Sequence, residues 1–345
     1  MLDSLFTPFT CRSLTVPNRW VMAPMTRGQS PQTIPGPQVA EYYRRRAAGG
    51  VGLIISEGTL VPHPLAANSS DLPSLSAEAI AGWREVIKAV HAEGGKIICQ
   101  LWHQGSKTQP GLGPIPVFVD GKQVVRKAVD ADLDDLKLAF VKAACAAREA
   151  GFDGVELHAA HGYLLDSYMR CALEPEAADF SQRERTFVQE VVREVRQCVG
   201  PDYFMVLRFS QWKLDNYDAH YIESLPQLEQ LLNPLRDAGV DVFHASTRRF
   251  WLPAFSGTHT LAGNTRQVTG RPVIAVGSVG LDGPNWANAV EGNPAVLERV
   301  VQEESLDFIA LGRILLADPE FVNKVRANRL DEIQPLTQEA FKAYP

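Results

Sequence analysis

The chain has 345 residues, of which 45% are hydrophobic and 21% charged, and its formal net charge is -6. These values indicate a globular protein with a sizeable core, either one large barrel or two ordinary domains. The acidic balance, with basic residues spread along the chain, argues against a nucleic acid partner. No apolar run reaches membrane-spanning length, and the N-terminus lacks the basic and apolar segments of a secretory signal, so we expect no membrane association.

Five cysteines are scattered along the chain: Cys11, Cys99, Cys145, Cys171 and Cys198. Their odd number and irregular spacing predict a reducing compartment, which we take to be the cytoplasm, and no disulfide framework. They also lack the close spacing that an iron–sulfur cluster requires.

Taken in order, the chain begins with a predicted hairpin between residues 5 and 18, and short apolar runs then alternate with longer helical stretches. Glycines such as Gly49 and Gly151 follow the helical stretches, as is typical of helix ends. The expected strands cover residues 19–23, 51–56, 96–101, 154–157, 204–209, 240–244, 272–276 and 308–311. The expected helices cover residues 38–48, 76–93, 132–150, 185–199, 225–238 and 285–301.

Eight strands, most of them followed by a helix, argue for parallel strands joined by right-handed crossovers. This length fits an α/β fold of the (β/α)8 barrel type better than an open sheet, and no Gly-x-Gly-x-x-Gly motif follows an early strand. We therefore predict a single barrel domain over residues 1–345. Two loop excursions interrupt the rhythm. Residues 117–125, after the third strand, contain the hairpin signal Asp120-Gly121, and residues 247–270 form a long capping loop after the sixth strand.

Three side chains that can exchange protons follow the fourth strand: His158, His161 and Tyr163. A helical turn here would let the two histidines, three residues apart, face the same way. Two imidazoles and a phenol in one small volume could hold a carbonyl oxygen and protonate a neighbouring atom. A histidine at a strand end is also a common structural residue. A His-x-x-His pair can belong to a zinc site, but no third-ligand pattern accompanies it, and we predict no metal.

Arg208 lies inside the apolar run that forms the fifth strand. Burying an unpaired guanidinium is costly, so this side chain needs either an electron-rich ligand or a carboxylate partner. Glu57, Glu156 and Asp241 are the candidates for a structural partner. The alternatives remain open from the sequence.

Active sites of such barrels gather at the carboxyl ends of the strands. Gln100, at the end of the third strand, offers an amide that can hydrogen-bond a planar heterocycle. Gly277 and Gly312 follow the seventh and eighth strands, where loops often hold a phosphate group, and Arg313 adds a fork of donors. Such glycines can also simply form tight turns, but the pair at this spacing favours a phosphate site.

Four segments together resemble the Old Yellow Enzyme family, the FMN-dependent ene-reductases, over nearly the whole chain. They are Asn18-Arg19-Trp20-Val21-Met22-Ala23-Pro24-Met25-Thr26-Arg27, Gln100-Leu101-Trp102-His103, Glu156-Leu157-His158-Ala159-Ala160-His161-Gly162-Tyr163-Leu164 and Leu311-Gly312-Arg313. Each segment is modest alone, but four in order, at matching places in an eight-unit barrel, make the resemblance specific.

The resemblance implies tightly bound, non-covalent FMN and NADPH or NADH as reductant. The residues that would bind FMN are Pro24, Met25, Thr26, Gly58, Gln100, Arg208, Gly277, Ser278, Gly312 and Arg313. It also implies that His158 and His161 bind the substrate oxygen, that Tyr163 donates a proton, and that Trp102 shapes the substrate pocket.

The sequence departs from the family in two places. Relatives usually carry a run ending in Tyr-Gly-Gly-Ser after the histidine motif, whereas this chain has an unrelated stretch over residues 169–181. Thr26 stands where some bacterial relatives have a cysteine. The shape of the loop after the fourth strand is therefore open.

The leading hypothesis is an NAD(P)H-dependent reductase of activated alkenes such as enones, and also of nitro compounds or nitrate esters, working by a ping-pong hydride transfer. One alternative is a redox-inactive barrel aldolase or isomerase that acts on a phosphorylated substrate. A second is a non-catalytic carrier of FMN. In each case the partner is a small molecule, and we expect a monomer or a homodimer.

Overall fold

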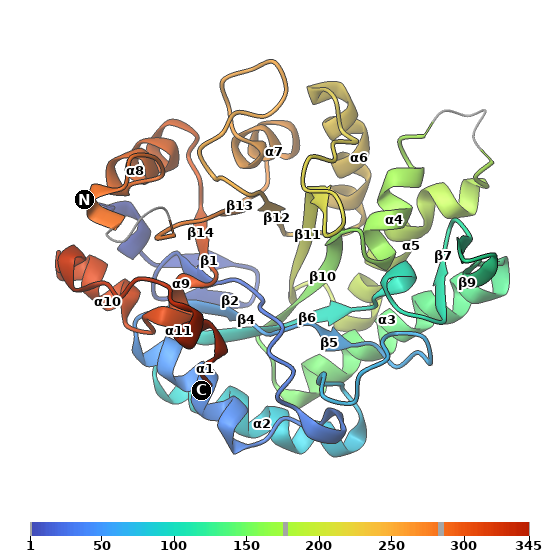
Figure 1. Ribbon diagram of the computed structural model, residues 1–345, viewed down its shortest axis with the longest axis horizontal. Helices are drawn as coiled ribbons and strands as arrows, with labels where there is room; N and C mark the ends of the chain where they lie inside the picture. The colour runs from blue at the N-terminus through green and yellow to red at the C-terminus, as the bar shows by residue number, and fades with distance from the viewer. Residues whose placement is uncertain (1, 175–178, 282–285, 345) are drawn as a thin grey trace.

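The computed structural model describes residues 2–174, 179–281 and 286–344, and its centre is a closed barrel of eight parallel strands (Figure 1). The barrel strands are β3 (Trp20–Met22), β4 (Leu53–Ile55), β6 (Lys96–Trp102), β10 (Gly154–His161), β11 (Phe204–Lys213), β12 (Val242–Ser246), β13 (Val273–Val276) and β14 (Phe308–Leu311). Each pairs in parallel with the next, and β14 pairs with β3 and closes the ring. The predicted (β/α)8 barrel is therefore confirmed.

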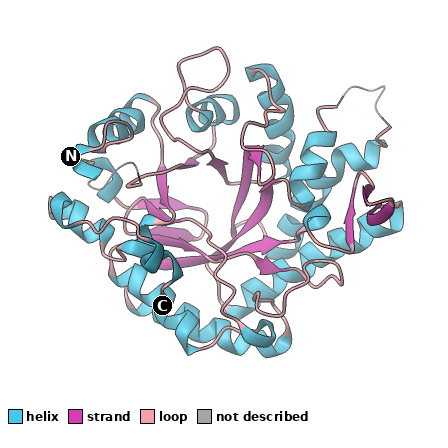
Figure 2. Ribbon diagram, viewed as in Figure 1, coloured by secondary structure: helices cyan, strands magenta, loops and turns pink. Residues whose placement is uncertain are grey.

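Helices cover the outside of the barrel (Figure 2). They are α1 (Pro37–Ala48), α2 (Ala77–Ala92), α3 (Asp130–Ala150), α4 (Leu164–Cys171), α5 (Gln182–Val199), α6 (Leu225–Ala238), α7 (Leu261–Thr269), α8 (Pro294–Glu303), α9 (Ile314–Ala317), α10 (Phe321–Arg326) and α11 (Gln338–Lys342). Single 3-10 turns cover Asp3–Phe6, Pro31–Thr33, Gly105–Lys107, Trp286–Asn288 and Leu330–Glu332.

Polar side chains cap the N-termini of several helices. The Ser76 hydroxyl accepts from Ala79 N at the start of α2, and Ser181 and Glu184 form a reciprocal capping box at the start of α5.

Two small sheets lie outside the barrel. The N-terminal hairpin is confirmed, because β1 (Phe9–Cys11) pairs antiparallel with β2 (Leu14–Val16). After β6 the chain leaves the barrel to form β7 (Gly111–Gly113), β8 (Val117–Val119) and β9 (Lys122–Lys127), while β5 (Thr59–Leu60) extends beside β6. Asp120 and Gly121 join β8 to β9 with φ values of 50° and 75°, the left-handed pair that the hairpin signal predicted.

Helix positions differ from the sequence-based expectation in three places. Residues 247–270 are not a loop throughout, because α7 occupies their last part and Thr260 caps it by accepting from Gly263 N. Helix α4, directly after the fourth barrel strand, was not expected. The helix predicted over residues 285–301 begins only at Pro294, where the Asn293 side chain caps it, and residue 285 lies outside the described residues.

The inside of the barrel changes character along its axis. Side chains two apart on a strand face the same way, so each strand contributes a series of inward positions. Near the N-terminal ends these are apolar, and the hairpin residues Leu14 and Val16 join that cluster. The next inward position after Ile98 is Gln100, the next after Val206 is Arg208, and the next after Val242 is His244. The barrel interior is therefore apolar at one end and polar at the end where the strands finish.

Cys145 of α3 and Cys198 of α5 form a disulfide, with their Cα atoms 6.3 Å apart. The expectation of a chain without disulfides is wrong for this pair, because helices that are distant in the sequence pack side by side here. Cys11, Cys99 and Cys171 are free. Within the described ranges, no helix is both long and apolar enough to cross a membrane.

Candidate active site

The two histidines meet because strand β10 carries a bulge. The expected helical turn at residue 158 is wrong, since β10 continues as a strand to His161. In a regular strand two residues three apart would point to opposite faces. The pairing with β11 shifts register between Ala159 and His161, and His161 has a φ of 67°, so its side chain is turned back toward His158. The ring centroids lie 5.1 Å apart, so the predicted convergence is observed by a different route.

Tyr163 completes the group from the start of α4. Its ring lies 5.1 Å from that of His158 and 5.0 Å from that of Trp102, which it meets edge-on. Burial raises the pKa of Tyr163, and the nearby Arg208 charge opposes this only in part. The phenol therefore keeps its proton at neutral pH and can act as a donor.

His161 is held from two sides. Its ring stacks on Trp212 at a centroid distance of 4.1 Å, and its Nε2 lies 2.8 Å from Ser246 Oγ. Ser246 Oγ also accepts from an Arg208 N–H at 3.2 Å, so its own hydrogen is left for His161 Nε2. The proton of the neutral ring then sits on Nδ1, which can donate to a ligand.

Both histidines are electrically neutral. Burial lowers the pKa of His158 and of His161 well below the ordinary value, and the Arg208 charge lowers both further. Neutral imidazoles donate hydrogen bonds without carrying a charge into the site. They can bind the oxygen of an uncharged substrate across the physiological pH range.

Arg208 forms no ion pair with any carboxylate in the described parts of the chain, although its side chain is buried. Asp241 instead pairs with Arg12 and Arg196, and Glu57 accepts from the backbone of residues 27 and 28. Glu156 is the carboxylate whose charge acts on Arg208, but it is hydrogen-bonded elsewhere.

Several buried polar atoms face the same region without a hydrogen-bond partner among the described residues. They are Arg208 Nε, His158 Nδ1, His244 Nε2 and Trp102 Nε1. Leaving such atoms unsatisfied costs about 1–3 kcal/mol each, so a cluster of them indicates a ligand site. Their mixture of donors and acceptors suits a large, polar, electron-rich ring.

The residues predicted to line that ring occupy neighbouring strand ends. Pro24 and Met25 follow β3 and are half-buried, while Thr26 is exposed. Gly58 is buried, and a Cβ at this position would lie 2.4 Å from the Trp102 ring. Glycine is therefore required there for Trp102 to pack, whatever else the site binds.

The predicted phosphate loops follow β13 and β14, which pair with each other. A Cβ at Gly277 would lie 2.7 Å from Thr247 Oγ1, so close packing of the loop after β12 already explains that glycine. A Cβ at Gly312, by contrast, would meet no atom within 4 Å, and Arg313 is exposed. The space beside Gly312 and Arg313 can admit an anion.

Sequence reasoning missed Arg249 at this place. The Ser278 hydroxyl accepts from Arg249 at 2.9 Å and donates to the Arg248 carbonyl at 2.7 Å. The sequence feature that could have indicated this residue is the pair Arg248 and Arg249, which comes shortly after the sixth barrel strand. The sequence analysis also did not predict four further residues of the site, which only the structure shows to face the barrel interior or its end. They are Glu156, Trp212, His244 and Ser246.

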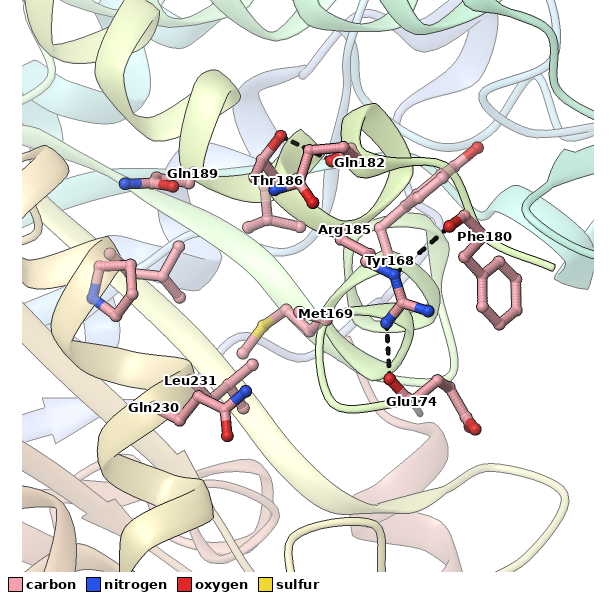
Figure 3. A pocket seen from close by; sticks show the side chains of 14 residues that line it. Tyr168, Met169, Glu174, Phe180, Gln182, Arg185, Thr186, Gln189, Gln230 and Leu231 are labelled. Atoms are coloured by element: carbon pink, nitrogen blue, oxygen red, sulfur yellow. Dashed lines mark hydrogen bonds between the residues drawn. The ribbon is translucent and has the colours of Figure 1, made fainter. Parts of the chain in front are cut away.

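Two cavities are relevant to the site. One of about 800 Å³ lies beside it and is lined in part by Trp212, Ser246, Arg248 and Arg249, a volume typical of ligand pockets. Another of about 470 Å³ is lined by residues of α4, α5 and α6, including Tyr168, Met169, Arg185 and Leu231 (Figure 3). The second contains none of the histidine group and is not part of the site.

Fold and site together define a barrel whose strands end in a polar centre, where two imidazoles and a phenol converge. Residues 4–332 match the model of the NADH:flavin oxidoreductase / NADH oxidase family, and the chain belongs to that family. This confirms the resemblance to the Old Yellow Enzyme family.

Several individual proteins are similar over most of the chain. An NADH oxidase of Thermoanaerobacter brockii is 32% identical over 96% of this chain and 52% of its own length. The 12-oxophytodienoate reductase 7 of Oryza sativa subsp. japonica is 29% identical over 94% of this chain and 88% of its own. The structure of morphinone reductase in complex with tetrahydroNAD superposes with a TM-score of 0.80 at 25% identity, covering 99% of this chain and 97% of that one. This chain thus spans about half the length of the NADH oxidase and nearly all of the other two.

The flavin of this family, FMN, fits the residues present. The buried, unpaired guanidinium of Arg208 suits the electron-rich ring, and the open space beside Gly312 suits the phosphate. The chain thus belongs to a family of flavin oxidoreductases, and the residues at its barrel end fit FMN.

Proposed function

We propose that this protein reduces activated C=C bonds, above all those of α,β-unsaturated carbonyl compounds, with NADPH or NADH as reductant. Nitro compounds and nitrate esters are electrophiles of the same kind and are included. The observation that carries the proposal is the convergence of His158, His161 and Tyr163 above a buried Arg208 that has no carboxylate partner in the described chain. One pocket serves both reactants in turn.

FMN would be held by Pro24, Met25, Thr26, Gly58, Gln100, Arg208, Gly277, Ser278, Gly312 and Arg313. Bound there, FMN would supply the hydride transfer between the nicotinamide and the alkene. His158 and His161 donate N–H groups to the substrate oxygen and so draw electron density away from the β-carbon. Tyr163 holds the proton destined for the α-carbon, and Trp102 forms the adjoining wall. Arg208 places a positive charge beside the ring.

The redox-inactive aldolase or isomerase is not favoured, because the family match covers residues 4–332 and a phosphorylated substrate alone would leave Arg208 unexplained. We further propose that residues 1–345 form one FMN-binding barrel domain that acts on small molecules in the cytoplasm as a monomer or homodimer, without a nucleic acid partner. The closed barrel supports the single domain.

The visible spectrum of the purified protein, recorded anaerobically, tests the function directly. We expect a yellow protein that bleaches on addition of NADPH or NADH and regains its colour on addition of 2-cyclohexenone. Bleaching without recovery would refute the proposed acceptor while retaining the flavin. A colourless protein that also takes up no added FMN would contradict the proposal as a whole.

Replacing Ser246 by Ala is expected to weaken the binding of a phenol ligand by about three- to tenfold, which corresponds to one hydrogen bond. The change removes the contact that orients His161, while the ring keeps its stack on Trp212. Affinity is measured by titrating the flavin absorbance. Ser76→Ala is the control, because it removes a helix cap of α2 and should lower Tm without changing the affinity. Equal affinities in wild type and Ser246→Ala would show that Ser246 does not orient the ring.

A further inference from the structure

Glu156 is an unusual residue to find inside this barrel. Its side chain is 0% exposed, on the inward face of β10 between apolar residues below and the candidate site above. A buried carboxylate is costly unless it is well paired. No lysine or arginine in the described ranges forms an ion pair with it, and apolar residues fill the equivalent positions lower in the barrel. Packing alone therefore does not explain a carboxylate at this position.

Two neighbours satisfy the Glu156 carboxylate. Gln100 Nε2 donates to Oε1 at 2.8 Å, and His244 Nδ1 lies 2.6 Å from Oε2. Because a carboxylate only accepts, His244 Nδ1 carries the donated hydrogen, and burial, more than any other cause, lowers the pKa of His244 and so favours the neutral ring. The charged and titratable groups that face this cluster are Arg208, His158 and His161. The cluster thus places a carboxylate at the base of the site whose two direct partners are an amide and an imidazole.

This arrangement decides which way the Gln100 amide points. A carboxylate only accepts hydrogen bonds, so the amide nitrogen must face Glu156. The carbonyl oxygen of Gln100 then points toward the candidate site, where it can accept a hydrogen bond from a ring N–H. The pyrimidine part of a flavin offers such an N–H.

The same carboxylate also acts on Arg208. Its negative charge favours the charged guanidinium, and it offsets part of the positive field that Arg208 would exert on a ligand above it. With a weaker positive field, a reduced and negatively charged ligand is stabilised less than it would be by Arg208 alone.

We infer that Glu156 is a positioning residue that orients the Gln100 amide and offsets part of the Arg208 charge, and that it thereby sets the reduction potential of bound FMN. The inference rests on the proposed flavin site but not on the identity of the electron acceptor. His244 serves in it only as a neutral N–H donor that holds the carboxylate in place.

The first variant is Glu156→Gln, which removes the charge and keeps the shape. The new amide can accept from Gln100 and donate to His244 Nδ1, because the imidazole can move its proton to Nε2. The potential of bound FMN should rise, by on the order of tenfold in the equilibrium constant toward the reduced form, or about 30 mV for a two-electron couple. FMN affinity, measured by fluorescence, should stay within about threefold, since the hydrogen bonds are kept. An unchanged or lower potential would overturn the inference.

The second variant, His244→Gln, tests the charge state of the Glu156–His244 pair. It also provides a test if Glu156→Gln does not fold. A glutamine amide is also a neutral donor to Glu156, so the potential should change far less than it does in Glu156→Gln. A fall in potential would show that a positive charge had been lost, and that His244 rather than Glu156 sets the field.

Asp241→Asn is the matched control. Asp241 is also a buried carboxylate, but it lies just before β12, at the other end of the barrel, and binds Arg12 and Arg196. Its variant should lower Tm and leave the potential unchanged. A wild-type protein that takes up no FMN would overturn the proposed function and this inference together. A wild type that binds FMN while Glu156→Gln leaves its potential unchanged would overturn this inference alone.

Discussion

The Tyr163→Phe variant is expected to reduce enones about 10²–10⁴-fold more slowly than the wild type, the range for loss of a general acid. The aromatic ring, and with it the contacts to Trp102 and His158, is kept, and only the hydroxyl is lost. Reduction of the flavin by NAD(P)H should be nearly unchanged, because that half-reaction needs no proton from Tyr163. Stopped-flow absorbance of the two half-reactions separates the effects.

Tyr168→Phe is the control for this variant. Tyr168 is buried on α4, five positions further along the chain, and its hydroxyl has no hydrogen-bond partner among the described residues. Removing that hydroxyl should leave both half-reactions at the wild-type rate. If Tyr163→Phe slowed the two half-reactions equally, Tyr163 would not be the proton donor.

The double variant His158→Ala/His161→Ala should lose most of its activity on enones. Each N–H donor aimed at a developing negative charge is worth about 10²–10³-fold in rate. Phenol binding, followed through the flavin absorbance, should weaken as well. His63→Ala is the control, since His63 pairs with His103 outside the site. Unchanged phenol affinity in the double variant would remove the two histidines from the substrate site.

The lowered pKa values of His158 and His161 add a pH test in the wild type. Because both rings stay neutral well below the ordinary histidine pKa of about 6.5, enone affinity should be level between about pH 6 and 8. A transition near the ordinary value would mean that one of these rings is charged in the working enzyme.

The sequence by itself determined the barrel and indicated many of the residues proposed for the site. Eight short apolar runs, separated by capped helices, predict parallel strands buried on both sides, and their number and the chain length favour a closed barrel over an open sheet. Since barrel sites gather at the carboxyl ends of the strands, His158, Tyr163, Gln100 and Arg208 could be chosen from their places in the chain alone. The hairpin at Asp120-Gly121 was also predictable, because its left-handed backbone favours those residue types.

Helix boundaries and side-chain directions were harder to predict from the sequence. The start of α8 at Pro294 and the existence of α7 depend on local caps that compete with longer apolar patterns. The direction of His161 depends on a bulge against β11, which no local pattern of β10 encodes.

Only the tertiary structure decided which distant residues meet. It showed that Ser246 and Trp212 hold His161, that Arg249 reaches Ser278, and that Cys145 pairs with Cys198. It also placed Glu156 between Gln100 and His244, and left Arg208 without the ion pair that the sequence had allowed. The physical reason is the same in each case. Local backbone preferences and hydrophobic period act within one segment, whereas these contacts depend on the register between strands and on how elements from different parts of the chain pack together.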